Sequence, residues 1–226
     1  ESLNESEKKL PSQNSNQTNK ESLDFENLNY SSVKEEVFYQ LENNLIKIVI
    51  SSKGGQITKA NLKRFDNYLK EPLNLVDNNQ TTRLVFKLKD GRIINTSKLN
   101  FEINKEKSKK GHLVMRALLS QDRWIEFQYS LIPDSYLLEY FISSSNLQSL
   151  VDASELNRLE WNLKSFRNSK SVEYENRYTE LTYGYENDKV NELSITGSDE
   201  EKVDEIQWIS YKQHFFNSIL IPDKKI

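Results

Sequence analysis

The sequence predicts an all-β domain built as a large antiparallel sandwich. Short segments in which apolar and polar residues alternate recur about every ten residues, and turn-forming residues separate them. A helical repeat does not persist for long anywhere before the last twenty or so residues. The 226 residues include 10 Phe, 11 Tyr and 3 Trp, so a sizeable core is possible although only 36% of the residues are hydrophobic. These observations favour a β-sandwich over a helical or α/β fold.

Residues 1–34 are dominated by Glu, Ser, Asn, Lys and Gln, and apolar residues are sparse there. Such a segment buries too little apolar surface to offset the entropy of ordering it. We therefore expect a polar linker or tail that contributes little to folding stability. An unremarkable terminus and a tether from a membrane anchor both fit this composition. The chain has no initiator Met and no signal-peptide pattern, so we expect that it begins after a removed segment.

The first predicted strands lie at residues 37–41 and 46–50, where apolar and polar side chains alternate. Gly54 and Gly55 follow, and two adjacent glycines between apolar runs indicate a turn or bulge with positive φ. Further along, the Asp90-Gly91 pair separates two alternating segments. It is the strongest short hairpin signal in the chain.

The middle of the chain contains the clearest strand, at residues 125–131, which ends at Pro133-Asp134. Residues 136–142 form a continuous apolar run, which is typical of a buried strand. Glu126 and Glu139 lie inside these two segments. Because alternate residues of an antiparallel strand face water, we expect both carboxylates to be solvent-facing.

The second half continues with an aromatic-rich stretch at residues 174–185 and an acidic loop at residues 198–201, which we expect to be solvated. Residues 206–226 differ, because their apolar residues fall near helical spacing. The two stripes are Ile206, Ile209, Phe216 and Leu220, and beside them Trp208, Tyr211 and Phe215. This wide apolar face predicts one or two short helices packed against the sandwich. An edge strand is the alternative, since β-branched and aromatic residues are frequent here.

The predicted organisation is therefore a polar tail at residues 1–34, a sandwich at residues 35–205 and a helical C-terminal segment at residues 206–226. The chain ends on its most apolar segment. We expect a hydrophobic membrane segment to follow it.

Composition and motifs exclude several classes of function. The net charge of −3 comes from 31 basic and 34 acidic residues, which gives no basic face for nucleic acid and no polybasic segment for an anionic membrane. The absence of Cys excludes disulfides and thiol chemistry. His112 and His214 have no partner at a metal-ligand spacing, and no phosphate loop or nucleophile elbow occurs. The sequence nominates no catalytic residue, no metal site and no cofactor.

One compact polar cluster, at residues 175–179, precedes the aromatic stretch. Within it, Arg177 can pair with a carboxylate or stack on Tyr178. We interpret these two residues as structural elements that brace a loop, with a role in lining a groove as the alternative.

Four segments resemble the large periplasmic domain of YidC-type membrane protein insertases. They are LIKIVISSKGGQI at 45–57, YSLIPDSY at 129–136, ENRYT at 175–179, and WISYKQHFF at 208–216 with the Ile-Pro pair at 221–222. The first resembles a strand that ends in a Lys-Gly-Gly turn, and the second a strand followed by a Pro-Asp turn. The last resembles the stretch before the second membrane segment of the insertase. They occur in the right order and cover about residues 37–226.

The resemblance implies a β-supersandwich similar to galactose mutarotase. It implies a soluble domain on the periplasmic side of the bacterial inner membrane, in a protein that helps integrate and fold inner-membrane proteins. The implied partners are Sec translocon components and nascent membrane proteins, with the membrane reached through flanking segments. Because the membrane region of that family carries out insertion, no catalytic residue is carried over, and we expect no enzyme activity. Trp208, Tyr211, Phe215 and Phe216 become the candidates for coupling the domain to a partner or the membrane.

A carbohydrate-binding or mutarotase-like sandwich is the alternative function. It is motivated by the many aromatic residues, because exposed Tyr and Trp rings stack on sugars. A likeness of fold alone does not transfer activity, and two isolated histidines support mutarotase chemistry poorly. If Trp161 and Trp208 are buried, the sugar hypothesis weakens.

Overall fold

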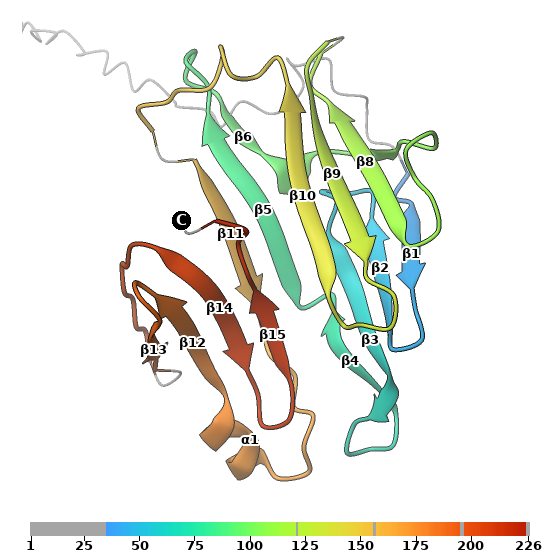
Figure 1. Cartoon of the computed structure of the whole chain (residues 1–226), viewed down its shortest axis with the longest axis vertical. Helices are drawn as coiled ribbons and strands as arrows, with labels where there is room; N and C mark the ends of the chain where they lie inside the picture. Colours follow the sequence, from blue (N-terminus) through green and yellow to red (C-terminus); the bar gives the residue numbers. More distant parts are fainter. Residues whose placement is uncertain (1–34, 121, 156, 195–196, 225–226) are drawn as a thin grey trace, which may run out of the picture.

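The computed structural model describes residues 35–120, 122–155, 157–194 and 197–224, and it confirms the all-β prediction. Strands make up four antiparallel sheets, and the described residues include one short α-helix, α1 (Val172–Tyr178) (Figure 1). The polar tail predicted at residues 1–34 lies outside the described residues. No helix in the described part of the chain has the length and apolar character needed to cross a membrane.

The first and second sheets contain most of the N-terminal half. The first has the order β1-β2-β3-β4, formed by β1 (Phe38–Glu42), β2 (Ile46–Ser51), β3 (Ile57–Asp66) and β4 (Pro72–Asp77). The second has the order β10-β9-β8-β7, formed by β7 (Glu102–Ile103), β8 (His112–Leu118), β9 (Trp124–Leu131) and β10 (Leu138–Ser145).

The third and fourth sheets complete the fold. The third has the order β11-β5-β6, formed by β5 (Gln80–Lys87), β6 (Ile93–Asn95) and β11 (Arg158–Leu163), and a short 3-10 helix, η2 (Thr96–Lys98), follows β6. The fourth has the order β13-β12-β14-β15, formed by β12 (Glu180–Tyr185), β13 (Lys189–Leu193), β14 (Ile206–Lys212) and β15 (Asn217–Leu220).

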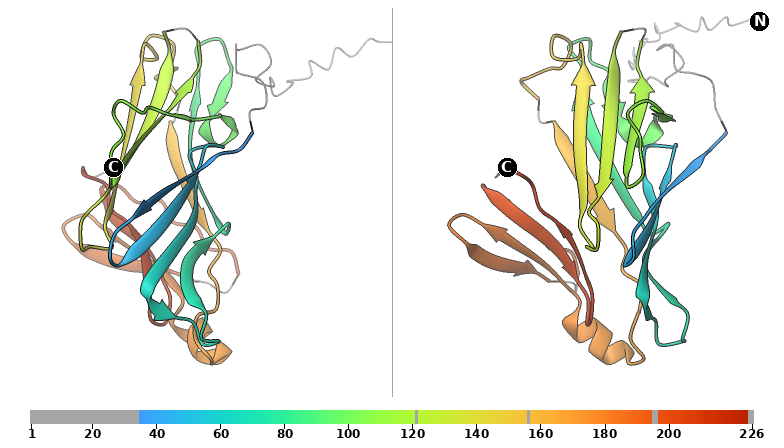
Figure 2. Two further views of the ribbon diagram at one scale, coloured as in Figure 1. Left: turned by 90° about the vertical axis from the view of Figure 1, so that its right-hand side faces the viewer. Right: turned by 45° about the vertical axis from the view of Figure 1, so that its right-hand side comes forward.

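The second sheet packs face to face on the first and third sheets, and the hydrophobic core lies between these layers (Figures 1 and 2). Alternate side chains supply it, such as Ile50 of β2, Phe86 of β5 and Phe127 of β9. The rings of Phe101 and Phe127 stack with centroids 4.4 Å apart. The fourth sheet lies nearest the first at the end of the molecule that carries α1 and splays away from it with distance from α1 (Figure 2).

Two predicted turns are confirmed. Gly54 and Gly55 have φ of 72° and 61°, and a Cβ on Gly55 would come within 2.6 Å of the Phe127 ring. That position therefore requires glycine both for its backbone and for the close approach of the core. The Asp90-Gly91 turn joins β5 to β6, which pair antiparallel as a hairpin.

The helical prediction for residues 206–226 is wrong. Ile206–Lys212 and Asn217–Leu220 form β14 and β15, and β14 pairs with β12 inside the fourth sheet. The edge-strand alternative describes β15 correctly. Tertiary pairing prevails here over helical spacing because β12 offers antiparallel pairing, with one irregularity at Gly184/Tyr185, to residues that favour strands.

The sequence interpretation missed α1, where Ser171 caps the helix by accepting a hydrogen bond from the Tyr174 N–H at 3.2 Å. It also expected a buried strand at residues 136–142. Instead, β10 begins at Leu138 and alternates between half-buried and more exposed positions.

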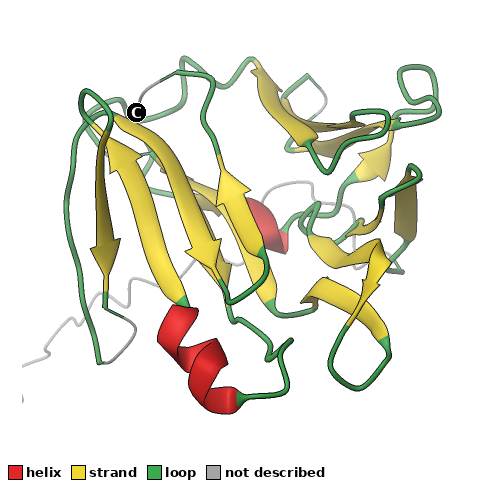
Figure 3. Ribbon diagram, turned by 60° about the horizontal axis from the view of Figure 1, so that its bottom comes forward, coloured by secondary structure: helices red, strands yellow, loops and turns green. Residues whose placement is uncertain are grey.

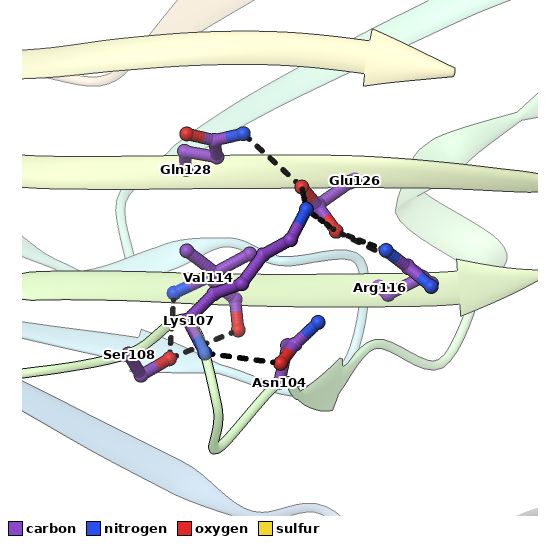
Figure 4. A network of polar contacts seen from close by, with 7 residues as sticks. All are labelled: Asn104, Lys107, Ser108, Val114, Arg116, Glu126 and Gln128. Carbon is purple, nitrogen blue, oxygen red and sulfur yellow. Dashed lines mark hydrogen bonds and ion pairs between the residues drawn. The ribbon is translucent and has the colours of Figure 1, made fainter. Parts of the chain in front are cut away.

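Glu126 contradicts the expectation that it faces water, whereas Glu139 is exposed as predicted. Glu126 does project from the outer face of β9, but the side chains of Lys107 and Arg116 cover it, and its exposed fraction is 0% (Figure 4). Strand alternation correctly predicted that Glu126 lies on the outer face of β9. It could not predict that Lys107 covers this carboxylate, because Lys107 comes from a neighbouring loop.

Candidate functional site

An apolar cleft of about 670 Å³ opens between the first sheet and the C-terminal hairpin β14–β15. Its volume falls in the range of about 300–1,000 Å³ that is usual for ligand pockets. The side chains that line it include no charged group. They are Ile46, Ile48, Ala60, Leu62, Phe65, Leu75, Val76, Tyr136, Leu138, Trp161, Phe215, Phe216, Asn217, Ser218 and Ile219.

The first wall of the cleft is the inner face of the first sheet. Ile46 and Ile48 of β2 stand beside Leu62 and Ala60 of β3 in the antiparallel register. Because side chains alternate along a strand, these residues share one face, and three of them also belong to the main core. The wall is therefore an extension of a packed core, which makes it rigid.

The opposite wall is the hairpin with its turn. Phe216 packs edge-on against Phe65 of β3, with ring centroids 5.3 Å apart, and this contact ties the turn to the first sheet. Trp161 of β11 also lines the cleft. It meets the Tyr211 ring edge-on at 4.7 Å, and the Tyr211 hydroxyl donates to the Trp161 carbonyl at 3.1 Å.

The four predicted coupling residues are not brought together at one place. Phe215 and Phe216 line the cleft, and Phe215 is 66% exposed. Tyr211 stands behind Trp161 and supports it. Trp208 projects from the opposite face of β14 and packs against Gly184 of β12, whose missing side chain leaves room for the indole.

The other two predicted residues lie on α1, the longer of the two helices drawn in Figure 3, and neither of them lines the cleft. Arg177 Nη2 lies 3.1 Å from Glu173 Oε1, so the expected pairing with a carboxylate is present. The guanidinium lies 5.3 Å from the ring of Tyr174, so the ring that it approaches is not Tyr178, which the sequence offered as the alternative to a carboxylate. Tyr178 instead stacks on His214 with centroids 4.8 Å apart.

Glu175 is the site residue that sequence reasoning missed. It is buried on α1, and its Oε2 accepts hydrogen bonds from the backbone N–H groups of Ser169 at 2.6 Å and Asn168 at 3.1 Å. Burial raises the pKa of this carboxyl, but the hydrogen bonds from Ser169 and Asn168 outweigh the burial and hold the pKa below its usual value. A charged carboxylate is therefore anchored inside the fold.

This carboxylate reaches the hairpin through Gln213. Gln213 Nε2 lies 3.5 Å from Glu175 Oε1 and also donates to the Phe166 carbonyl, and the Gln213 N–H donates to the Phe216 carbonyl at 2.8 Å. The network fixes the turn that carries Phe215 and Phe216. A signal was present in the sequence: Ser171 followed by Glu173 and Glu175 is typical of a helix N-terminus.

A second hollow of about 700 Å³ lies on the other face of the first sheet and is polar. Asn61, Asn74 and Lys59 line it from the strands, and Arg167 stacks on the Tyr68 ring with its Cζ 4.2 Å from the centroid. Its charged lining distinguishes it from the apolar cleft.

The two histidines contact a hydroxyl group and aromatic rings. His112 Nδ1 lies 2.7 Å from Ser130 Oγ on the neighbouring strand, and His214 lies in the stack of Tyr174, Tyr178 and Phe215 rings. Among the residues that the structure describes, no three His, Asp or Glu side chains lie close enough together to hold a metal ion. The geometry favours a site that binds apolar groups.

The sugar hypothesis receives little support from the tryptophans. Trp161 and Trp208 are half-buried, and both are engaged in packing. Trp161 contacts Tyr211 and donates from Nε1 to Gln80 Oε1 at 3.1 Å, whereas Trp208 lies on Gly184. Neither indole is held out as a free platform for a sugar ring.

The chain is similar to known proteins over most of its length. The profile of the YidC periplasmic domain matches residues 39–226. Relatives named membrane protein insertase YidC include the following three. The protein from Azobacteroides pseudotrichonymphae is 31% identical over 82% of this chain and 31% of its own length. Those from Porphyromonas gingivalis and Bacteroides fragilis are 33% and 31% identical, over 81% and 92% of this chain and 30% and 34% of their own lengths.

The chain thus spans about a third of the length of the curated relatives it matches. The matched region includes every described strand except the first residue of β1. These findings do not favour the sugar-binding alternative. The chain belongs to the YidC periplasmic domain family, the part of YidC-type membrane protein insertases that lies on the periplasmic side of the inner membrane.

Proposed function

We propose that this chain is a docking domain that helps its insertase integrate and fold inner-membrane proteins, and that it acts without enzymatic chemistry. The observation that carries the proposal is the apolar cleft, whose lining has no charged side chain. Segments destined for a bilayer are long apolar runs, and before insertion they need protection from water. A rigid apolar wall beside the membrane suits that need.

The partner at the cleft is then an apolar segment of a nascent membrane protein. The relatives are named as membrane protein insertases, which supports this choice of client. Sec translocon components are the second proposed partner class, and they would dock outside the cleft. Phe215 and Phe216 are the proposed contact residues for the client, with Tyr211 supporting the floor and Trp208 stabilising the sheet behind it.

Photo-crosslinking tests the proposal in the full-length insertase that contains this domain. A photoreactive residue replaces Phe215, which is 66% exposed and lines the cleft. The matched control replaces Val190 of β13, which is 64% exposed and does not line it. A ribosome-bound nascent membrane protein should crosslink from position 215 and not from position 190. Equal crosslinking from both positions, or none from position 215, would contradict a client site in the cleft.

A functional readout completes the test. Changing both Phe215 and Phe216 to Ala should impair membrane-protein insertion more than changing the exposed Glu200 to Gln, because the two rings form the cleft lip. Insertion equal to wild type in the double variant would show that the lip is dispensable.

A further inference from the structure

The strand β15 lies at the edge of the fourth sheet and, within the described residues, pairs with β14 alone. Gln213 N–H donates to the Phe216 carbonyl at 2.8 Å, so these two residues form a hydrogen-bonded pair of the hairpin. This pair determines which residues of β15 bond to β14. Antiparallel bonding alternates along a strand, so Ser218 and Leu220 direct their main-chain groups toward β14. The N–H and C=O groups of Asn217 and Ile219 therefore point away from the sheet.

This free edge opens into the apolar cleft. Three consecutive residues of β15, Asn217 to Ile219, line the cleft. Because successive side chains of a strand point to opposite faces, consecutive residues can line one cleft only through the edge of the strand. By contrast, β2 contributes Ile46 and Ile48, which is the pattern of a face.

A second edge strand borders the same cleft. Leu138, the first residue of β10, lines it together with Tyr136, and β10 pairs with β9 alone in the part of the chain that the structure describes. Unpaired strand edges are surfaces on which another strand pairs readily. Here they adjoin an apolar wall, so main-chain donors and a hydrophobic surface are offered together.

We propose that an extended, uncharged, apolar segment of a polypeptide adds to β15 as a further strand in this cleft. The inference rests on the proposed function and specifies its mode of binding. Main-chain hydrogen bonds to Asn217 and Ile219 hold the segment, and its alternate side chains contact the accessible part of the wall, at Phe65 and Leu75. A segment of five residues is about 17 Å long, which covers β15.

The chemistry of the cleft selects this occupant. The uncharged lining matches an uncharged segment, because a charged side chain would lose its water without gaining a partner. A helix satisfies its own main-chain groups and would leave the edge of β15 unpaired. An extended segment has free donors and acceptors at the spacing of a strand.

Two variants at one position separate main-chain pairing from side-chain contact. Ile219→Pro removes the outward N–H and leaves the bonds to β14, and edge strands tolerate proline where the N–H faces away from the sheet. Ile219→Ala keeps the N–H and removes the apolar side chain. Melting temperatures of both variants establish that the fold is retained.

The probe is a capped, fluorescein-labelled heptapeptide of alternating Thr and Val, and its counterpart carries a methyl group on every internal amide nitrogen. Fluorescence polarisation with the full 226-residue chain measures both. We expect affinity to fall by about tenfold or more on N-methylation and in Ile219→Pro, and by less than about threefold in Ile219→Ala. The N-methylated peptide tests the proposal without altering the protein.

Equal binding of the two peptides would overturn strand addition and leave the proposed function standing, since the cleft would then recognise side chains alone. Absence of binding for both peptides would also overturn it. The crosslinking at position 215 does not depend on the backbone of these peptides, so it decides separately whether the proposed client site fails as well.

Discussion

Replacing Arg116 by methionine should destabilise the domain more than neutralising the carboxylate with which it pairs. Glu126 is fully buried and accepts hydrogen bonds from Arg116 Nη2 at 2.6 Å, Lys107 Nζ at 3.1 Å and Gln128 Nε2 at 3.1 Å (Figure 4). Its cationic partners are more accessible, with side chains 29% exposed for Arg116 and 51% for Lys107. Arg116→Met therefore leaves a buried anion short of partners, whereas Glu126→Gln leaves two cations that reach water.

The two costs differ in size. Removing one partner of a buried ion pair costs about 3–5 kcal/mol, and the lower end applies because Lys107 remains. Losing a charged hydrogen bond costs about 1.5–3 kcal/mol, and the lower end applies to Glu126→Gln because the amide still accepts a bond. A domain of this size loses about 2–4 °C of Tm per kcal/mol. We expect a fall of about 6–12 °C for Arg116→Met and of about 3–6 °C for Glu126→Gln.

The pH dependence gives a second, independent signature. Burial raises the pKa of the Glu126 carboxyl, but the hydrogen bonds and charges of Arg116 and Lys107 outweigh it and hold the pKa below its usual value. This group therefore stabilises the wild type above its unfolded pKa, and that stabilisation is lost as pH falls through the folded pKa. In Arg116→Met burial dominates, so the folded pKa rises above the unfolded one, and acid relieves the penalty. The difference in Tm between the wild type and Arg116→Met should therefore become smaller as the pH is lowered from about 7 to about 4.

Thermal unfolding followed by circular dichroism at several pH values measures both effects. Arg177→Met is the matched control, because it breaks an exposed pair with Glu173 and should change Tm by less than about 2 °C at any pH. A difference in Tm between the wild type and Arg116→Met that stays constant with pH would refute the reasoning. So would a larger loss in Glu126→Gln than in Arg116→Met.

Three further outcomes are expected. Gly184→Ala should lower Tm by several degrees, because its Cβ would lie 2.2 Å from the Trp208 indole nitrogen, and Trp208→Leu in the same chain should restore part of the loss. Glu175→Gln should weaken the anchor of the Gln213 turn and lower Tm at neutral pH, and this loss should shrink only as the pH falls through the lowered folded pKa of the wild-type carboxyl; a loss that does not change with pH would contradict this. Deleting residues 1–34 should shift Tm by no more than a few degrees, and a larger fall would mean that the tail packs on the sandwich.

The strands that the sequence predicted well have strictly local signals. Period-2 alternation gave β2 and β9 to within a residue or so, and the glycines at 54–55 and 91 marked real turns. The hairpin β14–β15 was predicted as helix because aromatic and β-branched residues at spacings of three and four occur by chance in strands as well. Only the pairing of β14 with β12 decides between the two, and that pairing joins segments about 25 residues apart.

The cleft could be predicted only in part. Phe215 and Phe216 were singled out for their apolar character and do line it, but Ile48, Leu62 and Trp161 come from three other elements. Alternation shows which residues of one strand point to the same face of a sheet. It does not show which other element packs against that face. The burial of Glu126 was missed for the same reason, since its cover comes from Arg116 on the neighbouring strand β8 and Lys107 in a separate loop.

An open apolar cleft needs a physical support, because the hydrophobic effect favours its closure. Two contacts resist closure here. The edge-on packing of Phe216 against Phe65 fixes the distance between the turn and the first sheet. Glu175 holds Gln213 from the other side, and moving the turn inward would break a buried, charged hydrogen-bond network. The apolar lining therefore stays open, and weakening the Glu175 anchor should let the hairpin settle onto the wall and reduce crosslinking of the proposed client at position 215.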